Sequence, residues 1–425
     1  MNRFLLIAFL LFIGAGCGED DSSEITPTPK PETTIPAPKT TVLIKVNINP
    51  GANFSSADDW LIVNDSHGSL LAYHSFESGQ SFEMTTTEQV TDKILLSRFR
   101  RFADDPSEQA IGIITWADVT PGQEFVVPAK ITQGIQQTGT FTVKLDYETG
   151  TNIDFPDINA MVSCSEGFAS GSGGIGGDLY ILSNTHYEGI TKYLLTASNL
   201  DQMGYKFLEG VHAGDVDEVK FSELTPFEHQ IEFTFPETDH ATLFTTQAEP
   251  GKNSSASGYQ VMKRWPDDMR SSLNAGYISS LGAPLTYLEL TYETGNRLIY
   301  TNNGEIPTGH VGWPAFSDYK VISEDINTYA YSAPERTKYG VGQWRFTEGN
   351  TLYGWTFYSS NHVHVIPNLP EELLTKYPGI IMDKFRYTGT HFVAEGLSYE
   401  AYIKGYFERD DLTATEVIDV ILTKK

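Results

Sequence analysis

The stretch "WRFTEGNTLYGWTFYSS", residues 344–360, decides the fold class. Aromatic and β-branched residues, which favour strands, lead into Glu348–Gly349–Asn350 and resume directly after it. Glycine and asparagine accept the backbone angles that a tight turn needs. The stretch therefore predicts a hairpin that turns at these three residues. The alternation of side chains places Trp344 and Trp355, one on each strand, on faces that can pack a core.

Similar strand-like runs continue in both directions along the chain. Short apolar runs such as "TTVLIKVNI" (40–48) and "HQIEFTFPE" (229–237) are bounded by Asn, Asp, Gly or Pro. Runs of this length and spacing are typical of β-sandwiches. We therefore expect an all-β protein with two or three immunoglobulin-like sandwich units in tandem. One short helix is predicted near 369–378, "LPEELLTKYP", which has acids in its first turn and a proline at its end.

The length of 425 residues exceeds what a single hydrophobic core usually supports, about 250–300 residues. Shifts in composition divide the chain into five segments. We expect a signal peptide, an acidic and proline-rich tether, two β-sandwich units and an aromatic-rich β domain, at 1–16, 17–40, 41–137, 138–237 and 238–425.

The N-terminal stretch "RFLLIAFLLFIGAGC", residues 3–17, has the features of a processed leader. Arg3 precedes ten apolar residues, half of the about 20 that cross a bilayer but enough for a signal peptide. Three small residues then lead to Cys17. The stretch resembles the lipobox of bacterial lipoproteins, although Gly14 stands where that motif usually has leucine. The resemblance implies that Cys17 is lipidated; the alternative is an ordinary signal peptide.

The residues after Cys17 suggest where such a lipoprotein would be located. "CGEDD" (17–21) resembles the acidic export tag of surface lipoproteins from Bacteroidota, and it could also simply begin a solvated tether. Residues 22–40 contain five prolines and predict an extended stalk. The strand pattern of 41–137 resembles immunoglobulin-like or carboxypeptidase-regulatory-like modules. These resemblances imply an uncharacterised type of outer-membrane lipoprotein that faces the cell exterior, and they imply no activity.

The net charge argues against two classes of binding partner, and the cysteine content argues against a fold held by disulfides. The 29 basic and 55 acidic residues give a net charge of −26, which argues against nucleic acid and against anionic lipid headgroups as partners. The second of the two cysteines, Cys164, has no partner if Cys17 carries lipid. The sequence therefore predicts no disulfide framework, and Cys164 is expected to be a small buried apolar residue.

Two short motifs have the residue types of a binding site, one for a metal and one for a dinucleotide. "NHVH" places His362 and His364 two residues apart, so on a strand both would leave the same face and could share a metal. His391 or Glu395 would be the third ligand; the alternative is a solvated histidine pair. "GSGGIGG" (171–177) has the glycine spacing of a dinucleotide loop, but a strand-like segment follows it instead of a helix, so we expect a flexible hairpin loop.

The aromatic residues of the last segment offer one more candidate site. Trp313, Trp344 and Trp355 could form an exposed platform that stacks on sugar rings. The alternative is that they pack the core, because 12% aromatic residues is ordinary for an all-β protein.

From these observations we predict a non-catalytic surface lipoprotein without a cofactor. It would be held to the membrane by its lipid and would bind extracellular material, such as a glycan, or another envelope protein. The alternatives are a glycan-binding protein that uses the three tryptophans and a metal-assisted hydrolase that uses the histidine pair.

Overall fold

The computed structural model describes residues 40–424, except 51, 53–55, 91, 106–107, 130–134, 149–158, 169, 177–178, 199–201, 251–257, 265–269, 362–364 and 409–415. These residues belong to the unit Thr40–Lys425. The predicted leader, Cys17 and the tether lie outside the described residues. The all-β fold class is confirmed, since strands dominate and form several sheets.

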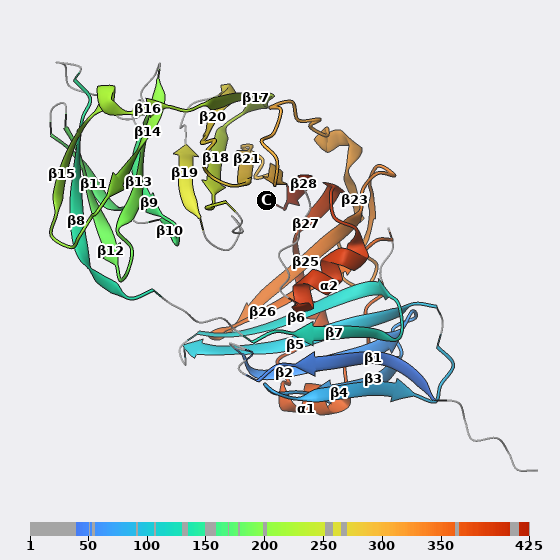
Figure 1. Cartoon of the computed structure of the whole chain (residues 1–425). Helices are drawn as coiled ribbons and strands as arrows, with labels where there is room; N and C mark the ends of the chain where they lie inside the picture. The colour runs from blue at the N-terminus through green and yellow to red at the C-terminus, as the bar shows by residue number, and fades with distance from the viewer. Residues whose placement is uncertain are drawn as a thin grey trace, which may run out of the picture. The chain divides into compact units, whose positions relative to one another are not determined.

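A twelve-stranded sheet is the largest element of the fold (Figure 1). Its neighbouring strands run antiparallel except for β26 and β6, which run parallel. In order across the sheet the strands are β19 (Tyr259–Arg264), β18 (His240–Gln247), β21 (Pro284–Thr291), β22 (Arg297–Asn303), β28 (Glu416–Thr423), β27 (Arg386–Glu395), β25 (Tyr339–Glu348), β26 (Thr351–Ser359), β6 (Glu108–Val119), β5 (Ile94–Asp105), β2 (Ser56–Asp65) and β3 (Leu70–Ser75).

The hairpin predicted at 344–360 lies near the middle of this sheet. Strands β25 and β26 pair antiparallel, with Trp344 directly opposite Trp355. The chain turns at Gly349, whose φ of 58° lies in the left-handed region that glycine adopts without a steric cost. The predicted turn and the shared face of the two tryptophans are both confirmed.

One face of the sheet forms the main core. Leu243, Leu288, Leu298, Val420 and Phe392 point from five successive strands into one cluster and are almost completely buried. The elements that cover this face contribute side chains to the same cluster. They include β17 (His229–Thr238), β20 (Arg270–Tyr277), β24 (Ala330–Ser332), α1 (Glu371–Lys376) and the 3-10 turns η2 (Phe316–Asp318) and η3 (Met382–Lys384).

The described elements cover the opposite face along part of its length only. A second core forms where Leu61, Leu96 and Trp116 meet the helix α2 (Tyr399–Glu408) and a three-stranded sheet. That sheet has the order β4 (Ser81–Thr86), β1 (Thr41–Ile48) and β7 (Gln123–Val127). A further two-stranded sheet pairs β23 (Lys320–Ser323) with β24.

Residues 137–226 form a separate small β-sandwich around a third core (green in Figure 1). It lies in the sequence between strands of the twelve-stranded sheet and is called the inserted sandwich below. Cys164 lies buried in this core, as expected, and burial raises the pKa of its thiol. One sheet has the order β10 (Gly167–Phe168), β9 (Asn159–Cys164), β13 (Lys192–Ser198), β14 (Met203–Glu209) and β16 (Thr225–Pro226). The other has the order β11 (Ser170–Gly176), β12 (Leu179–Tyr187), β8 (Gln137–Asp146) and β15 (Val216–Lys220), which is followed by the 3-10 turn η1 (Phe221–Glu223).

Three expectations about local structure and boundaries need correction. The predicted segments 41–137 and 238–425 are not separate tandem units, because their strands share the twelve-stranded sheet. The glycine-rich stretch 171–177 is largely strand β11 and not a loop, since pairing with β12 satisfies its backbone without side chains. The helix predicted near 369–378 is confirmed as α1, but it is not the single helix expected, since residues 399–408 form α2.

Candidate functional site

The uncovered part of the twelve-stranded sheet is the most distinctive surface of the described structure. Strands β18, β21, β22, β28 and β27 bury one row of side chains each and leave the alternate row partly exposed. We call this surface the open face. Its partly exposed members include Phe244, Tyr287, Glu289, Arg297, Ile299, His391, Asp419 and Ile421.

The open face has charged residues at the centre of apolar strands. Glu289 stands opposite Ile299, and Ile299 stands opposite Asp419, so the two carboxylates lie on one row two strands apart. Neighbouring strands are about 4.8 Å apart, which separates the two backbones by roughly 9–10 Å. Arg297 and His391 lie on the adjacent row, on either side of Ile421. Tyr287, Glu289, Arg297, His391 and Asp419 are called the polar strip below.

Glu289 is held from two sides. The Tyr287 hydroxyl donates a hydrogen bond to Glu289 Oε2 at 2.5 Å, and Arg297 Nη1 donates to Glu289 Oε1 at 3.0 Å. Burial, reinforced by the adjacent Glu289 carboxylate, raises the pKa of Tyr287. The phenol therefore stays protonated and remains a donor. These contacts fix the carboxylate without using all of its lone pairs, since each carboxylate oxygen can accept two hydrogen bonds.

His391 and Asp419 make the second pair of the polar strip. His391 Nε2 lies 3.1 Å from Asp419 Oδ1, and the two side chains are 30% and 16% exposed. Neither of these two atoms makes a hydrogen bond of good geometry to another group in the described part of the chain. The pair is therefore a close contact between an imidazole and a carboxylate whose hydrogen-bonding capacity is incompletely used.

An aromatic pair borders the polar strip. The rings of Phe244 and Tyr287 stack across β18 and β21, with centroids 4.7 Å apart and planes 19° from parallel. Lys263 on the edge strand β19 stands opposite Phe244, and burial lowers the pKa of its amine. The open face thus combines an aromatic surface with two basic and two acidic side chains and a histidine.

The polar strip is not explained by the stability of the fold. The Arg297–Glu289 pair, with side chains 40% and 21% exposed, belongs to the class of exposed ion pairs that contribute about 0–1 kcal/mol. Apolar residues fill the equivalent positions on the other face and pack without such pairs. The Arg297–Glu289 pair therefore contributes little to the stability of the fold.

The three predicted tryptophans do not form a platform. Trp344 and Trp355 are each 1% exposed in the main core, where their indole N–H groups donate to the Glu324 carbonyl and to Thr115 Oγ1. Trp313 is half-buried and donates to the Thr234 carbonyl. The core-packing alternative is confirmed for Trp344 and Trp355, because a buried ring cannot meet a sugar.

The predicted metal site is not assembled from the described residues. His362 and His364 lie outside those residues. Of the third-ligand candidates, His391 faces Asp419, and the Glu395 carboxylate pairs with Arg336 at 3.0 Å. In the described part of the chain, no three His, Cys, Asp or Glu side chains are grouped so that they could hold a metal ion.

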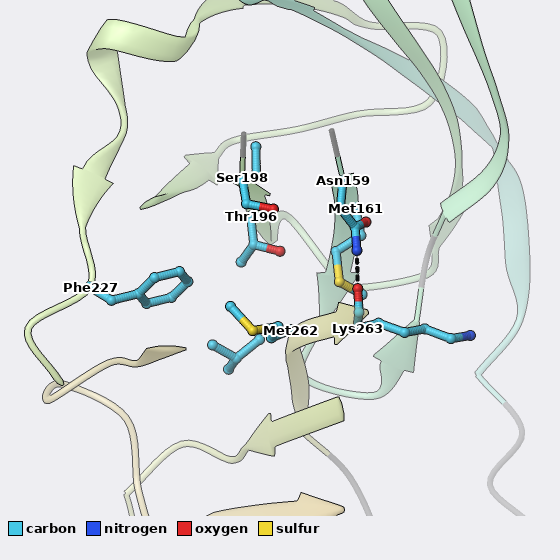
Figure 2. A pocket seen from close by; sticks show the side chains of 9 residues that line it. Asn159, Met161, Thr196, Ser198, Phe227, Met262 and Lys263 are labelled. Carbon is cyan, nitrogen blue, oxygen red and sulfur yellow. Dashed lines mark hydrogen bonds between the residues drawn. The ribbon is translucent and has the colours of Figure 1, made fainter. Parts of the chain in front are cut away.

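A small pocket lies between the inserted sandwich and strand β19 (Figure 2). Met161, Met262 and Phe227 line it, and the Asn159 amide donates to the backbone carbonyl of Lys263 beside it. The volume of its cavity is only about 10 Å³. Small-molecule sites usually enclose about 300–1,000 Å³, so this pocket is a packing gap between two β layers.

Sequence reasoning missed four of the five residues of the polar strip. The available signal was a single charged residue at the centre of an apolar strand, as in "TYLELT" (286–291) and "VIDVI" (417–421). That signal becomes specific only when the sheet order is known, because β21 and β28 are separated in the sequence by more than a hundred residues.

Comparison of the sequence with protein-family models and with curated proteins finds no match. Among the helices in the described ranges, none is long and apolar enough to cross a membrane.

Proposed function

We propose that the protein is a lipid-anchored cell-surface protein that binds an extracellular ligand on the open face, without catalysing a reaction. The anchor is Cys17, at the end of a leader with signal-peptide length and composition. The extended stalk of residues 22–40, at about 3.1 Å per residue, would hold the folded part tens of ångströms from the bilayer. The outer membrane is the proposed location because of the acidic tag that follows Cys17.

The observation that carries the binding role is the polar strip, on a part of the sheet face that no described element covers. Tyr287 and Arg297 position the Glu289 carboxylate, and His391 lies against Asp419, before any ligand arrives, which lowers the entropic cost of binding. Both oxygens of Glu289 accept hydrogen bonds within the strip, so this carboxylate is arranged as a fixed acceptor and not as a free acid. This arrangement favours recognition over hydrolysis.

The anchor is tested by metabolic labelling. Radiolabelled palmitate should enter the wild-type protein and should be absent from the Cys17→Ser variant, because only the thiol accepts the acyl-glycerol group. Protease added to intact cells should remove the wild-type protein if it faces the exterior. Label in both forms, or none in either, would contradict the proposed anchor.

The binding role is tested on intact cells that display the protein. The cells are incubated with fluorescent mucin, fibronectin, peptidoglycan fragments and a set of plant and bacterial polysaccharides. We expect at least one probe to bind to wild-type cells and to be lost from a Glu289→Gln, Asp419→Asn double variant displayed at the same level. Capture of a probe that the double variant retains in full would contradict the assignment to the open face.

A further inference from the structure

The chemistry of the polar strip narrows the class of ligand, an inference that rests on the proposed function. We infer that the open face binds a neutral polysaccharide, whose sugar rings contact Phe244 and Tyr287 and whose hydroxyls bond to Glu289 and Arg297. Three properties of the face support this ligand in place of a polyanion, a cation or an apolar protein surface.

The first property is charge. The acidic side chains Glu289 and Asp419 are matched by Arg297 on the face and by Lys263 on the adjoining strand β19, while the whole chain carries a net charge of −26. A polyanion would be repelled by the protein and would find no excess of positive charge on this face. A cation would be attracted equally well to acidic residues elsewhere. The local balance of charge therefore complements an uncharged ligand.

The second property is the mixture of donors and acceptors. Glu289 retains acceptor capacity beyond its bonds to Tyr287 and Arg297, and the guanidinium of Arg297 has five N–H groups, of which one bonds to Glu289. A fixed acceptor thus lies beside a fixed donor. Sugar hydroxyls donate and accept at once, so neighbouring hydroxyls can satisfy both groups together. An apolar ligand would remove water from both groups without satisfying their remaining hydrogen-bonding capacity.

The third property is the adjacent aromatic surface. Tyr287 and Glu289 are two residues apart on one strand, a spacing of roughly 6.5–7 Å along the face. The hydrogen bond to Glu289 and the stack on Phe244 hold the Tyr287 ring in place. The apolar faces of sugar rings pack on such aromatic surfaces. Ring contact and hydroxyl contact are thus available to one sugar or to two neighbouring sugars of a chain.

The test measures affinity with full-length protein in detergent. The probes are laminarin, galactomannan, xyloglucan and glycogen as neutral glycans, and heparin and polygalacturonate as anionic ones. We expect at least one neutral glycan to bind with a Kd that changes less than about twofold between 50 and 500 mM NaCl, because exposed charge pairs are screened over this range and a neutral ligand is not. Glu289→Gln, which keeps the shape of the side chain, should weaken binding at least tenfold.

The matched control is Glu218→Gln. Glu218 also pairs with a basic residue at hydrogen-bond distance, Lys144 at 2.9 Å, but on β15 of the inserted sandwich. This variant should bind like wild type. Arg297→Gln provides a second variant of the face, and equal urea midpoints for all forms would show that they are folded.

The outcomes separate the inference from the proposed function. A failure of every neutral glycan to bind, or binding of heparin or polygalacturonate that falls with salt, overturns the inference. If a non-glycan ligand binds and Glu289→Gln weakens it, the inference fails and the proposed function stands. If a ligand binds equally to wild type, Glu289→Gln and Arg297→Gln, both fail.

Discussion

The indole of Trp344 packs against its own strand because residue 342 is glycine. A Cβ atom at Gly342 would lie 2.4 Å from a ring atom of Trp344 and 2.9 Å from the ring of Tyr329, both of which are buried. Neither ring is free to move away, because the indole N–H of Trp344 is bonded to the Glu324 carbonyl. The hairpin that organises the sheet therefore depends on the absence of a side chain at this position.

We expect Gly342→Ala to lower the free energy of unfolding by about 1–3 kcal/mol, the usual cost of overpacking a core. Gly354→Ala is the control, since Gly354 lies on the paired strand β26 and a Cβ there meets nothing within 4 Å. The urea midpoints of the two variants measure the difference. Equal midpoints would contradict the proposed role of Gly342.

At the residue scale, the sequence predicted packing better than binding. The turn at Gly349 and the inward direction of Trp344 and Trp355 follow from local alternation and turn chemistry. The polar strip does not, because Glu289 and Asp419 become neighbours only through pairing of both strands with β22. Local patterns report which face a residue occupies and not which distant residue shares that face.

At the element scale, helix α1 is attached to the sheet through a part-buried carboxylate. Asp58 on β2 accepts hydrogen bonds from Lys376 at 2.6 Å, from Tyr377 and from Trp60 at 2.9 Å. Burial alone would raise the pKa of Asp58, but these hydrogen bonds outweigh it and lower the pKa below the usual 3.8. The attachment thus stabilises the folded state while Asp58 is ionised.

Because the folded-state pKa of Asp58 is depressed, its contribution is complete above the unfolded pKa of about 3.9 and is lost as the pH falls through the lower folded value. We expect Asp58→Asn to cost about 1–3 kcal/mol at pH 7, the range for a buried hydrogen-bonding group that loses partners. The difference from wild type should shrink below about pH 4. Urea unfolding at pH 7, 5 and 3 measures it, and a difference that grows in acid would contradict this account.

The two helices also differ in how well the sequence predicted them. The prolines and first-turn acids of α1 are local signals, and they predicted the helix. The segment that forms α2 is rich in aromatic residues and reads as strand, although Ser398 caps its start by accepting from the Ala401 N–H at 3.2 Å. Its helical state depends on burying Tyr399, Ile403 and Phe407 together, which only the second core makes possible.

At the scale of the whole molecule, the parallel pairing of β6 with β26 joins the early and late parts of the chain in one sheet. Residues 109–116 pair with residues 351–358, across the whole inserted sandwich. The strand pattern predicted a boundary between these segments because such a pattern does not reveal which distant strands pair. The confirmed all-β class followed from composition and periodicity, which are local properties.

This continuity predicts cooperative unfolding of the two segments. A fragment of residues 40–137 should not fold alone. It would expose the edge of β6, and it would lack the side chains that α2 contributes to the second core. Circular dichroism measures whether the fragment has a thermal transition. The same measurement is made on a protein that protease has cut once within the inserted sandwich. A fragment with a cooperative thermal transition would contradict the shared sheet.

The central claim is that ligand occupies the open face, and hydroxyl-radical footprinting of the full-length protein with the neutral glycans tests it most directly. The account predicts that Phe244, Tyr287 and His391 become protected from oxidation when a glycan is added, while the exposed Tyr73 on β3 is oxidised as before. Unchanged oxidation of all three open-face residues, or protection confined to another surface, would contradict it.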